Sequence, residues 1–326
     1  MNLSWGFQNI WNTQLDLAHD KKDKKIFPRN TIWASELGSA YIDVFLKMKG
    51  EKPSNDFTMT ALRKFDAGII WEKIMEIVLK RIGVLKEKQE VCMFNLKNAV
   101  PVRGRLDFVA GGVIDEKKAK EELEKIKNFI PENIYGASFS IIDVLKGKEL
   151  QEIVLEIKSV SSFVFDKYSQ TGANLNHKLQ LFHYLISTGL NEGHIIYISK
   201  DDARILEVGI FNPSSVKEEY EKWVLEFSEY FLSDKMPPKE KEIVFNEDLE
   251  KLEVNWKVLY SPYLTKIYNF KDQNEVREKF DPLVSSFNRV IKKAKNKEKL
   301  TERDLEKIEE MKKYGFDLEK KYILTK

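Results

Sequence analysis

Apolar residues recur at helical spacing near both ends of this chain and change to a strand-like pattern in its middle. Within residues 31–49 they recur every three or four positions and stop at Gly50, which predicts a helix. A second helix is expected over Thr60–Ile82, because glycine, here Gly83, commonly follows a helix end. Other helices are expected over residues 115–130, 174–188, 216–232, 274–295 and 302–313.

Strand-like segments fill the middle of the chain. They are expected over residues 90–96, 100–110, 139–145, 151–160, 194–199 and 204–211. The first two would form a hairpin through Lys97-Asn98, and the last two a hairpin through residues 200–203. This order of helices and strands predicts an α/β fold, with a small mixed β-sheet flanked by helices and helical extensions at both ends.

One expected strand carries charges inside an apolar run. Gln151–Val160 contains Glu156 and Lys158, which are two positions apart and therefore point to the same face of a strand. A carboxylate and an ammonium in such a segment cost free energy unless they are paired or functional. The chain has other Asp/Glu-x-Lys triplets, but only this one lies in an apolar strand-like run. The two residues are therefore candidates for catalysis, with an internal structural ion pair as the alternative.

A second carboxylate would complete a site for a divalent metal. Mg²⁺ prefers carboxylate oxygens and few protein ligands, and it keeps waters and a substrate phosphate as its other ligands. Asp107, in a glycine-containing part of an expected strand, is the first candidate, although it could instead cap a turn near Gly111. Asp143 is an alternative, because it is closer to Glu156 in the sequence. Lys158 would position the attacking water and offset the negative charge that builds on a phosphate.

Four short motifs now show a resemblance to a known family. Gly104-Arg105-Leu106-Asp107, Leu155-Glu156-Ile157-Lys158-Ser159 and Gln180-Leu181-Phe182-His183-Tyr184 resemble the GxxD, ExK and QxxxY motifs of RecB-like nucleases. Gly68 and Glu72 resemble an upstream helical motif that adds an acidic residue. These nucleases belong to the PD-(D/E)XK superfamily, alongside lambda-type exonucleases and CRISPR-associated RecB-like nucleases. The matches span about residues 60–210 and keep the order of the family.

The resemblance implies a role for each matched residue. The implied metal ligands are Asp107, Glu156, the carbonyl of Ile157 and, directly or through water, Glu72. Lys158 would orient or activate the attacking water. Gln180 and Tyr184, four apart on one helical face, would reach the phosphate or brace Lys158. Glu76 is an alternative to Glu72 as the upstream acid.

Other polar residues near the motifs have simpler expected roles. Arg103 and Arg105 alternate with the buried face of their strand and are candidates to contact phosphate. His177 and His183 flank the QxxxY motif and are expected to be packed or hydrogen-bonded rather than catalytic.

Two departures from the family pattern stand out. Asp107 and Glu156 are further apart in sequence than the family usually shows, which predicts an insertion over residues 113–150. Several relatives carry an iron–sulfur cluster on four cysteines, and Cys92 is the single cysteine of this chain. No iron–sulfur cluster is therefore expected, and Mg²⁺ or Mn²⁺ is the expected cofactor.

Composition and charge limit the kind of nucleic-acid surface and the cellular location that the chain can have. The chain has 326 residues, of which 42% are hydrophobic, and a net charge of only +2, so a nucleic-acid surface would have to be local. The N-terminus lacks the layout of a signal peptide, and no apolar run approaches the roughly 20 residues of a membrane helix. We therefore expect a cytoplasmic protein of bacterial or phage-like type without a membrane partner.

The expected domains are an N-terminal helical extension over residues 1–57, a nuclease-like core over 58–235 and a mostly helical, basic C-terminal extension over 236–326. A basic cluster at Lys21, Lys22, Lys24 and Lys25 is expected to be a solvated loop, and Asn212-Pro213 is a typical helix start.

These expectations combine into a metal-dependent DNA nuclease. By analogy with the family, it would be an exonuclease or end-processing enzyme of DNA recombination, repair or phage and mobile-element DNA metabolism. Its expected partners are DNA and a helicase, recombinase or single-strand-binding protein. The alternatives are a catalytically silent nucleic-acid-binding or assembly module with the same fold and a restriction-type endonuclease. The sequence does not specify the oligomeric state.

Overall fold

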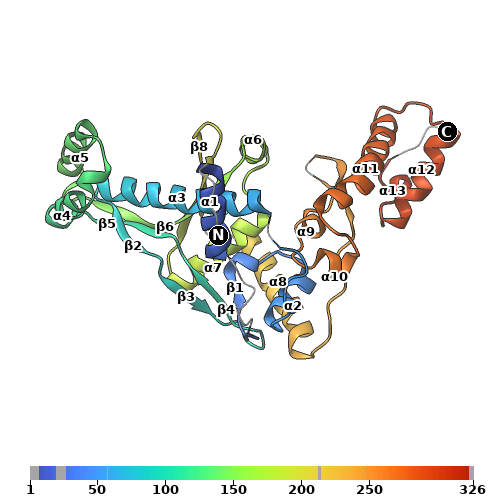
Figure 1. Cartoon of the computed structure of the whole chain (residues 1–326), viewed down its shortest axis with the longest axis horizontal. Helices are drawn as coiled ribbons and strands as arrows, with labels where there is room; N and C mark the ends of the chain where they lie inside the picture. Colours follow the sequence, from blue (N-terminus) through green and yellow to red (C-terminus); the bar gives the residue numbers. More distant parts are fainter. Residues whose placement is uncertain (1–6, 20–26, 57, 212–213, 248, 323–326) are drawn as a thin grey trace. The chain divides into compact units, whose positions relative to one another are not determined.

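The computed structural model describes residues 7–19, 27–56, 58–211, 214–247 and 249–322 of the chain (Figure 1). The basic cluster at residues 21–25 and the helix start at residues 212–213 lie outside these described residues. The chain divides into two compact units. The first unit takes in the described parts of residues 1–25, 29–38 and 57–235, and the second unit those of 26–28, 39–56 and 236–326.

A five-stranded mixed sheet forms the centre of the first unit. Its order is β2-β5-β6-β7-β8, and only β6 and β7 are parallel. The strands are β2 (Leu85–Lys88), β5 (Phe108–Val113), β6 (Glu149–Val160), β7 (Glu192–Ser199) and β8 (Ile205–Phe211). The predicted α/β class and the hairpin now formed by β7 and β8 are confirmed, whereas β2 was not predicted.

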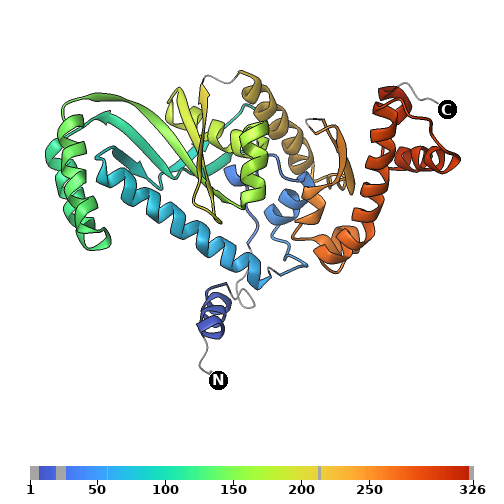
Figure 2. The same ribbon diagram turned by 90° about the horizontal axis from the view of Figure 1, so that it is seen from above.

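Two long helices cover the two faces of this sheet. α3 (Met59–Arg81) packs Leu79 and Met75 against Phe108 and Leu155 on one face. α7 (Leu175–Thr188) lies on the opposite face, where Leu181 closely approaches Gly193 of β7. Figure 2 shows α3 running along the sheet. Both helices were predicted at nearly these bounds. Three further helices of this unit are α1 (Phe7–His19), α6 (Ser162–Thr171) and α8 (Ser214–Leu232).

A second, three-stranded sheet adjoins α7 in the same unit. Its order is β1-β4-β3, with β1 (Ile32–Trp33) parallel to β4 (Val102–Arg105) and β3 (Val91–Phe94) antiparallel to it. The prediction of one helix over residues 31–49 is therefore wrong in its first part. Trp33 has an extended backbone (φ −83°, ψ 137°), a 3₁₀ turn η1 (Ala34–Glu36) follows, and Gly38 has a positive φ. Only α2 (Tyr41–Met48) is helical there.

The strand expected over residues 100–110 is in fact two strands in different sheets. β4 ends at Arg105 and pairs with β3, whereas β5 begins at Phe108 and pairs with β2 and β6. At the junction, the Leu106 N–H donates to the Glu90 carbonyl and the Gln89 N–H donates to the Asp107 carbonyl. The chain thus passes from one sheet to the other immediately before Asp107.

The predicted insertion over residues 113–150 consists mainly of a helical hairpin. It contains α4 (Glu116–Ile126), a 3₁₀ turn η2 (Lys127–Phe129) and α5 (Glu132–Leu145), and it lies beside the C-terminal part of α3 (Figures 1 and 2). The strand predicted over residues 139–145 is wrong, because these residues end α5. Phe139 and Ile142 pack there against Leu123 and Ile126. A short apolar run of this length does not distinguish strand from helix.

The second unit is mostly helical and has its own core, which includes Phe280, Phe287 and Met311. The predicted helices over residues 274–295 and 302–313 are confirmed, and the Thr301 side chain caps the second of them by accepting from the Asp304 N–H. The elements after α2 are β9 (Ile243–Asn246), β10 (Lys251–Val254), α9 (Trp256–Leu259), α10 (Leu264–Tyr268), α11 (Gln273–Lys295), α12 (Glu302–Lys313) and α13 (Leu318–Lys321). The β9–β10 hairpin was not predicted.

Among the helices of the described residues, none combines the length and apolar character that a membrane span requires.

One buried carboxyl makes the stability of the second unit depend on pH. Asp43 is 6% exposed and accepts a hydrogen bond of 2.8 Å from the Ser261 hydroxyl. Burial raises its pKa from 3.8 to about 6, in spite of that hydrogen bond and the nearby Lys47. The folded state therefore binds this proton more tightly than the unfolded chain. The contribution of the Asp43 carboxyl to the free energy of unfolding is therefore most favourable below its pKa in the unfolded chain. This contribution is lost as the pH rises through its pKa in the folded state.

We expect Asp43→Asn to stabilise the second unit by about 1–3 kcal/mol near pH 7.5, because asparagine is uncharged and still accepts from Ser261. The gain should shrink toward zero as the pH falls to about 4. Urea unfolding at both pH values measures this. Asp281→Asn, at an exposed acid of α11, is the control, and an equal gain from Asp43→Asn at both pH values would show that ionisation is not the cause.

Candidate active site

The pairing of β5 with β6 brings two acids together. Phe108 lies opposite Leu155 in this antiparallel ladder, so Asp107, one residue before Phe108, comes next to Glu156, one residue after Leu155. The Ile157 N–H donates to Asp107 Oδ2 at 2.8 Å. The strand register therefore joins the GxxD and ExK segments, although the helical hairpin separates them in the sequence.

Lys158 lies beside these acids on the same face of β6. Its ammonium is 2.6 Å from Glu156 Oε1 and donates to Gln180 Oε1 at 2.9 Å. The Glu156 side chain is only 2% exposed and the Lys158 side chain is 22% exposed. Burial alone would lower the pKa of the Lys158 ammonium, but the charge and hydrogen bond of Glu156 and the charge of Asp107 raise it overall. The pair is thus an ion pair, held at the edge of solvent.

The helix α7 supplies a chain of hydrogen bonds behind Lys158. Gln180 Nε2 donates to the Tyr184 hydroxyl at 2.9 Å, and that hydroxyl donates to the Arg105 carbonyl at 3.0 Å. The four-residue spacing of Gln180 and Tyr184 puts both on one face of α7. Burial, followed by the charge of Glu156, raises the pKa of Tyr184. Both residues are buried, and their hydrogen bonds lead from the Arg105 carbonyl to the Lys158 ammonium.

The carboxylates are suited to a divalent cation. Burial and then the charge of Glu156 raise the pKa of Asp107 well above its ordinary value. Glu156 Oε2 is buried and has no hydrogen-bond partner among the described residues. Such an oxygen is costly to bury, and a cation would compensate it. The donors that fit are Asp107, Glu156 and the Ile157 carbonyl.

The described residues offer no larger set of metal-binding side chains. Among the described residues, no group of three or more His, Cys, Asp or Glu side chains could hold a metal ion. A pair of carboxylates with one carbonyl is a set that suits Mg²⁺, which usually retains several waters, better than Zn²⁺, which is typically enclosed by three or four protein ligands.

The two candidates for the upstream acid differ in their surroundings. Glu76 forms ion pairs with Lys73, Lys80 and Lys88 at 2.8, 3.2 and 2.7 Å. Although burial opposes it, these hydrogen bonds lower the pKa of Glu76 to about 2. Burial raises the pKa of Glu72, and the charges of Arg105 and Glu156 also act on it. Glu72 is thus near enough to Glu156 for its charge to act on it, but it does not form with Asp107 and Glu156 a group of three acids that could hold a metal, whereas Glu76 belongs to a lysine cluster.

The alternative acid Asp143 is not at this site. It is exposed on α5 and pairs with Lys146 at 3.3 Å, and the hydrogen bond from Lys146 lowers its pKa. The two histidines are packed and hydrogen-bonded. His177 Nδ1 is 2.8 Å from the Tyr197 hydroxyl and His183 Nδ1 is 3.1 Å from the Tyr220 hydroxyl. Burial lowers the pKa of His177 to about 3 and that of His183 to about 4.

Gln89 is a residue of the site that sequence reasoning missed. Its side-chain amide donates to Glu72, and its backbone joins the junction before Asp107. Its φ of 54° is in the left-handed region, which a glutamine rarely adopts. Nothing in the local sequence marks it, because the contact depends on how β2 leads into β3.

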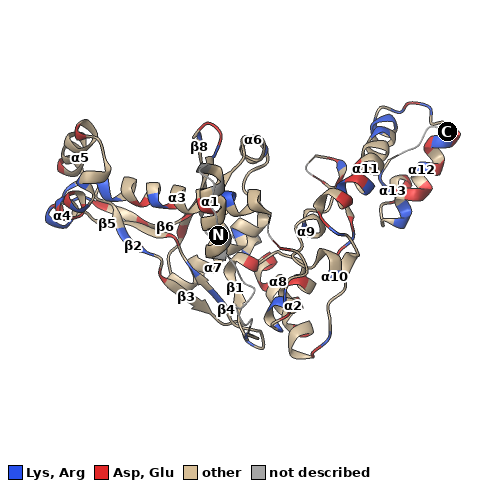
Figure 3. Cartoon of the chain, viewed as in Figure 1, with Lys and Arg blue, Asp and Glu red and all other residues tan. Residues whose placement is uncertain are grey.

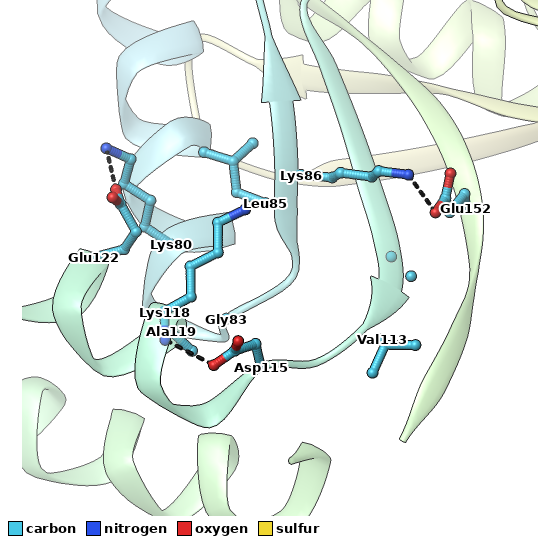
Figure 4. A pocket seen from close by; sticks show the side chains of 12 residues that line it. Lys80, Gly83, Leu85, Lys86, Val113, Asp115, Lys118, Ala119, Glu122 and Glu152 are labelled. Carbon is cyan, nitrogen blue, oxygen red and sulfur yellow. Dashed lines mark hydrogen bonds and ion pairs between the residues drawn. The ribbon is translucent and has the colours of Figure 1, made fainter. Parts of the chain in front are cut away.

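A separate pocket of about 220 Å³ lies between α3, β2, β5 and α4, and Figure 4 shows its lining. Most of its charged side chains already have a partner. Lys80 pairs with Glu122 at 3.0 Å, and Lys86 pairs with Glu152. Asp115 accepts from the Lys118 N–H at the start of α4. None of Asp107, Glu156 or Lys158 lines it, so it is distinct from the candidate active site.

Comparisons with known proteins give only distant similarities. No protein-family model matches the sequence, and no curated protein matches it. The crystal structure of SSO0001 is similar at 16% sequence identity and a TM-score of 0.45, over 80% of this chain and 96% of that chain.

The alkaline exonuclease LHK-Exo from Laribacter hongkongensis is similar at 10% identity and a TM-score of 0.37, over 68% of this chain and 93% of that one. LHK-Exo in complex with dAMP is similar at 10% identity and a TM-score of 0.40, over 63% and 89% of the two chains. These similarities are too distant to carry an argument about activity, which rests on the geometry of the site.

Proposed function

We propose that the first unit is a metal-dependent nuclease that hydrolyses phosphodiester bonds in DNA. The observation that carries this proposal is the half-buried Asp107 next to the buried Glu156, with an unpartnered oxygen on Glu156 and the Lys158 ammonium held beside it. Metal-assisted hydrolysis of a phosphodiester needs carboxylates that hold the metal and a nearby positive charge, here the Lys158 ammonium. The order of the four sequence motifs supports the same assignment, and residues 58–235 would be the nuclease core.

Each residue of the site would have its own role in this reaction. A divalent cation held by Asp107, Glu156 and the Ile157 carbonyl would polarise the scissile phosphate and lower the pKa of a bound water. Lys158 would position the attacking water and offset the negative charge that develops on the phosphate. Gln180 would fix the Lys158 ammonium by its hydrogen bond, and Tyr184 would fix Gln180 in turn.

We further propose that the enzyme acts at DNA ends, as an exonuclease or end-processing nuclease. The resemblance to RecB-like nucleases supports this, and a partner such as a helicase, recombinase or single-strand-binding protein would fit the same setting. A silent binding module would bind DNA without metal-dependent products, and a restriction-type endonuclease would cut closed circles.

The test compares linear and closed-circular DNA, single- and double-stranded, in Mg²⁺, Mn²⁺ or EDTA. We expect loss of linear DNA with either metal and none in EDTA. Asp107→Asn should reduce cleavage at least about 100-fold, because the amide keeps the shape but not the charge of the ligand. Asp115→Asn is the matched control, since asparagine also caps a helix well. Equal cleavage by Asp107→Asn and wild type would refute the proposed site.

A further inference from the structure

The three-stranded sheet of the first unit has one face that α7 does not cover. Along β4, Val102 and Gly104 are buried, whereas Arg103 and Arg105 are exposed. Trp33 on β1 is 40% exposed, and Val91 and Met93 on β3 are 53% and 52% exposed. The five exposed residues Trp33, Val91, Met93, Arg103 and Arg105 define what we call the β1–β4–β3 outer face. Large apolar side chains that gather at an exposed surface commonly mark a binding site.

The strand register arranges these side chains in rows. Arg103 pairs with Trp33 on one side and with Met93 on the other, and Arg105 pairs with Val91. The Arg103 guanidinium carbon lies 5.5 Å from the centre of the Trp33 ring. Such a cation–π contact orients both groups and leaves guanidinium N–H groups available to a further partner.

Among the described residues, the two arginines differ from the lysines of β2 in forming no ion pair with a carboxylate. Within the part of the chain that the structure describes, no carboxylate forms an ion pair with Arg103 or Arg105. On β2, in the five-stranded sheet, Lys86 by contrast pairs with Glu152 and Lys88 pairs with Glu76. Figure 3 shows the basic positions on β4. Two guanidinium groups without an ion pair, beside an exposed aromatic ring, form a surface suited to an anionic chain that carries planar rings.

The Arg105 end of this outer face is close in the chain to the acids of the candidate active site. The Arg105 carbonyl accepts from Tyr184, and Asp107 follows two residues later. The Arg105 charge also acts on Glu72, whose pKa it tends to lower. Arg105 therefore lies between the exposed Trp33 row and the carboxylates.

We propose that the β1–β4–β3 outer face binds single-stranded DNA, with a base stacked on Trp33 and backbone phosphates at Arg103 and Arg105. The bound strand would lead from Trp33 past Arg105 to Asp107 and Glu156. In a duplex both faces of each base are covered by its neighbours, so only an unpaired base offers a free face to Trp33. This inference rests on the proposed nuclease function and adds the form of its substrate.

The test measures binding of the full chain to a fluorescently labelled thymidine oligonucleotide in EDTA, which separates binding from cleavage. We expect Trp33→Ala to weaken binding about 10- to 100-fold, Trp33→Phe to restore most of it, and blunt duplex binding to change little. Trp256→Ala is the matched control, because Trp256 is 43% exposed in the second unit. Arg103→Ala should reduce the slope of log affinity against log salt by about 0.7.

Each outcome decides between the two proposals. If Trp33→Ala and Trp256→Ala bind the oligonucleotide equally well, or if wild type does not bind it, the outer-face proposal is wrong whatever the cleavage assay gives. If binding depends on Trp33 but no metal-dependent product forms, the nuclease proposal fails and the outer face remains a single-strand binding site. Thermal unfolding followed by circular dichroism establishes that the variants are folded.

Discussion

Lys158→Ala should lower the rate of metal-dependent DNA cleavage about 100- to 10,000-fold, the range that a positioned catalytic group contributes. The ammonium contacts Glu156 at 2.6 Å and is held by Gln180 at 2.9 Å, so no neighbouring side chain can replace it without moving. Single-turnover cleavage of a linear substrate with saturating Mg²⁺ measures the effect. DNA binding in EDTA should remain, because the lysine is a small part of the surface that a DNA strand would contact.

The chain offers a control for this variant in another acid-x-Lys triplet. Lys118 is exposed on α4 and is preceded at the same spacing by Glu116, but it lies outside the sheet. Lys118→Ala should cleave DNA as wild type does. Removal of Lys158 also leaves Glu156 without its partner, so stability is measured with and without Mg²⁺. A folded Lys158→Ala enzyme that retains activity within about threefold of wild type would exclude Lys158 from the chemistry.

Gly104→Ala should destabilise the first unit by about 2–4 kcal/mol, at or above the usual range for overpacking a core. A β-carbon at this position would lie 2.5 Å from Cε1 of Tyr184 and 2.8 Å from Cβ of Ala34. The Tyr184 ring cannot easily yield, because its hydroxyl is hydrogen-bonded to both Gln180 and Arg105. Chemical denaturation of the purified variant measures the loss.

Gly136→Ala is the matched control for this substitution. Gly136 lies in α5, and a β-carbon there would meet no atom within 4 Å. Alanine favours a helix interior by about 0.5–1 kcal/mol over glycine, so this variant should be slightly more stable than wild type. A Gly104→Ala protein as stable as wild type would mean that α7 can shift away from β4. Activity should also fall in Gly104→Ala, since Tyr184 and Gln180 position Lys158.

Much of the fold was predictable because local patterns agreed with it. Long periodic segments such as α3, α7 and α11 are predicted nearly at their observed bounds, and Gly189 follows α7 while Thr301 precedes α12, as glycine and threonine commonly do at helix ends and starts. The sequence also predicts that the side chains of Asp107, Glu156 and Lys158 are neighbours, and the register of β5 and β6 brings them together. Glu156 and Lys158 stand out in the sequence because charged residues inside an apolar strand cost free energy unless they are paired or functional.

The missed features depend on pairing between distant segments. β1 has only two residues, and Trp33 fits the helical spacing of the apolar residues that follow it, so the extended form of β1 depends on its ladder with β4. The last turn of α5 looks like a strand because its residues are branched and apolar. Gln89 joins the site only through the crossing between the two sheets. In each case tertiary contacts, which a single sequence does not display, decide the local structure.

The helical hairpin of residues 113–150 is attached at the far end of the strands that carry the two acids. The β5–β6 ladder runs from the pair Val113–Glu149 at the hairpin to Phe108–Leu155 beside the site, a span of roughly 17 Å at the usual rise per residue. Changes in the length of the hairpin therefore leave the spacing of Asp107 and Glu156 unaltered. That independence makes the hairpin tip a natural place to insert a fluorescent reporter or an affinity handle, and it allows this segment to diverge in sequence while the chemistry stays fixed.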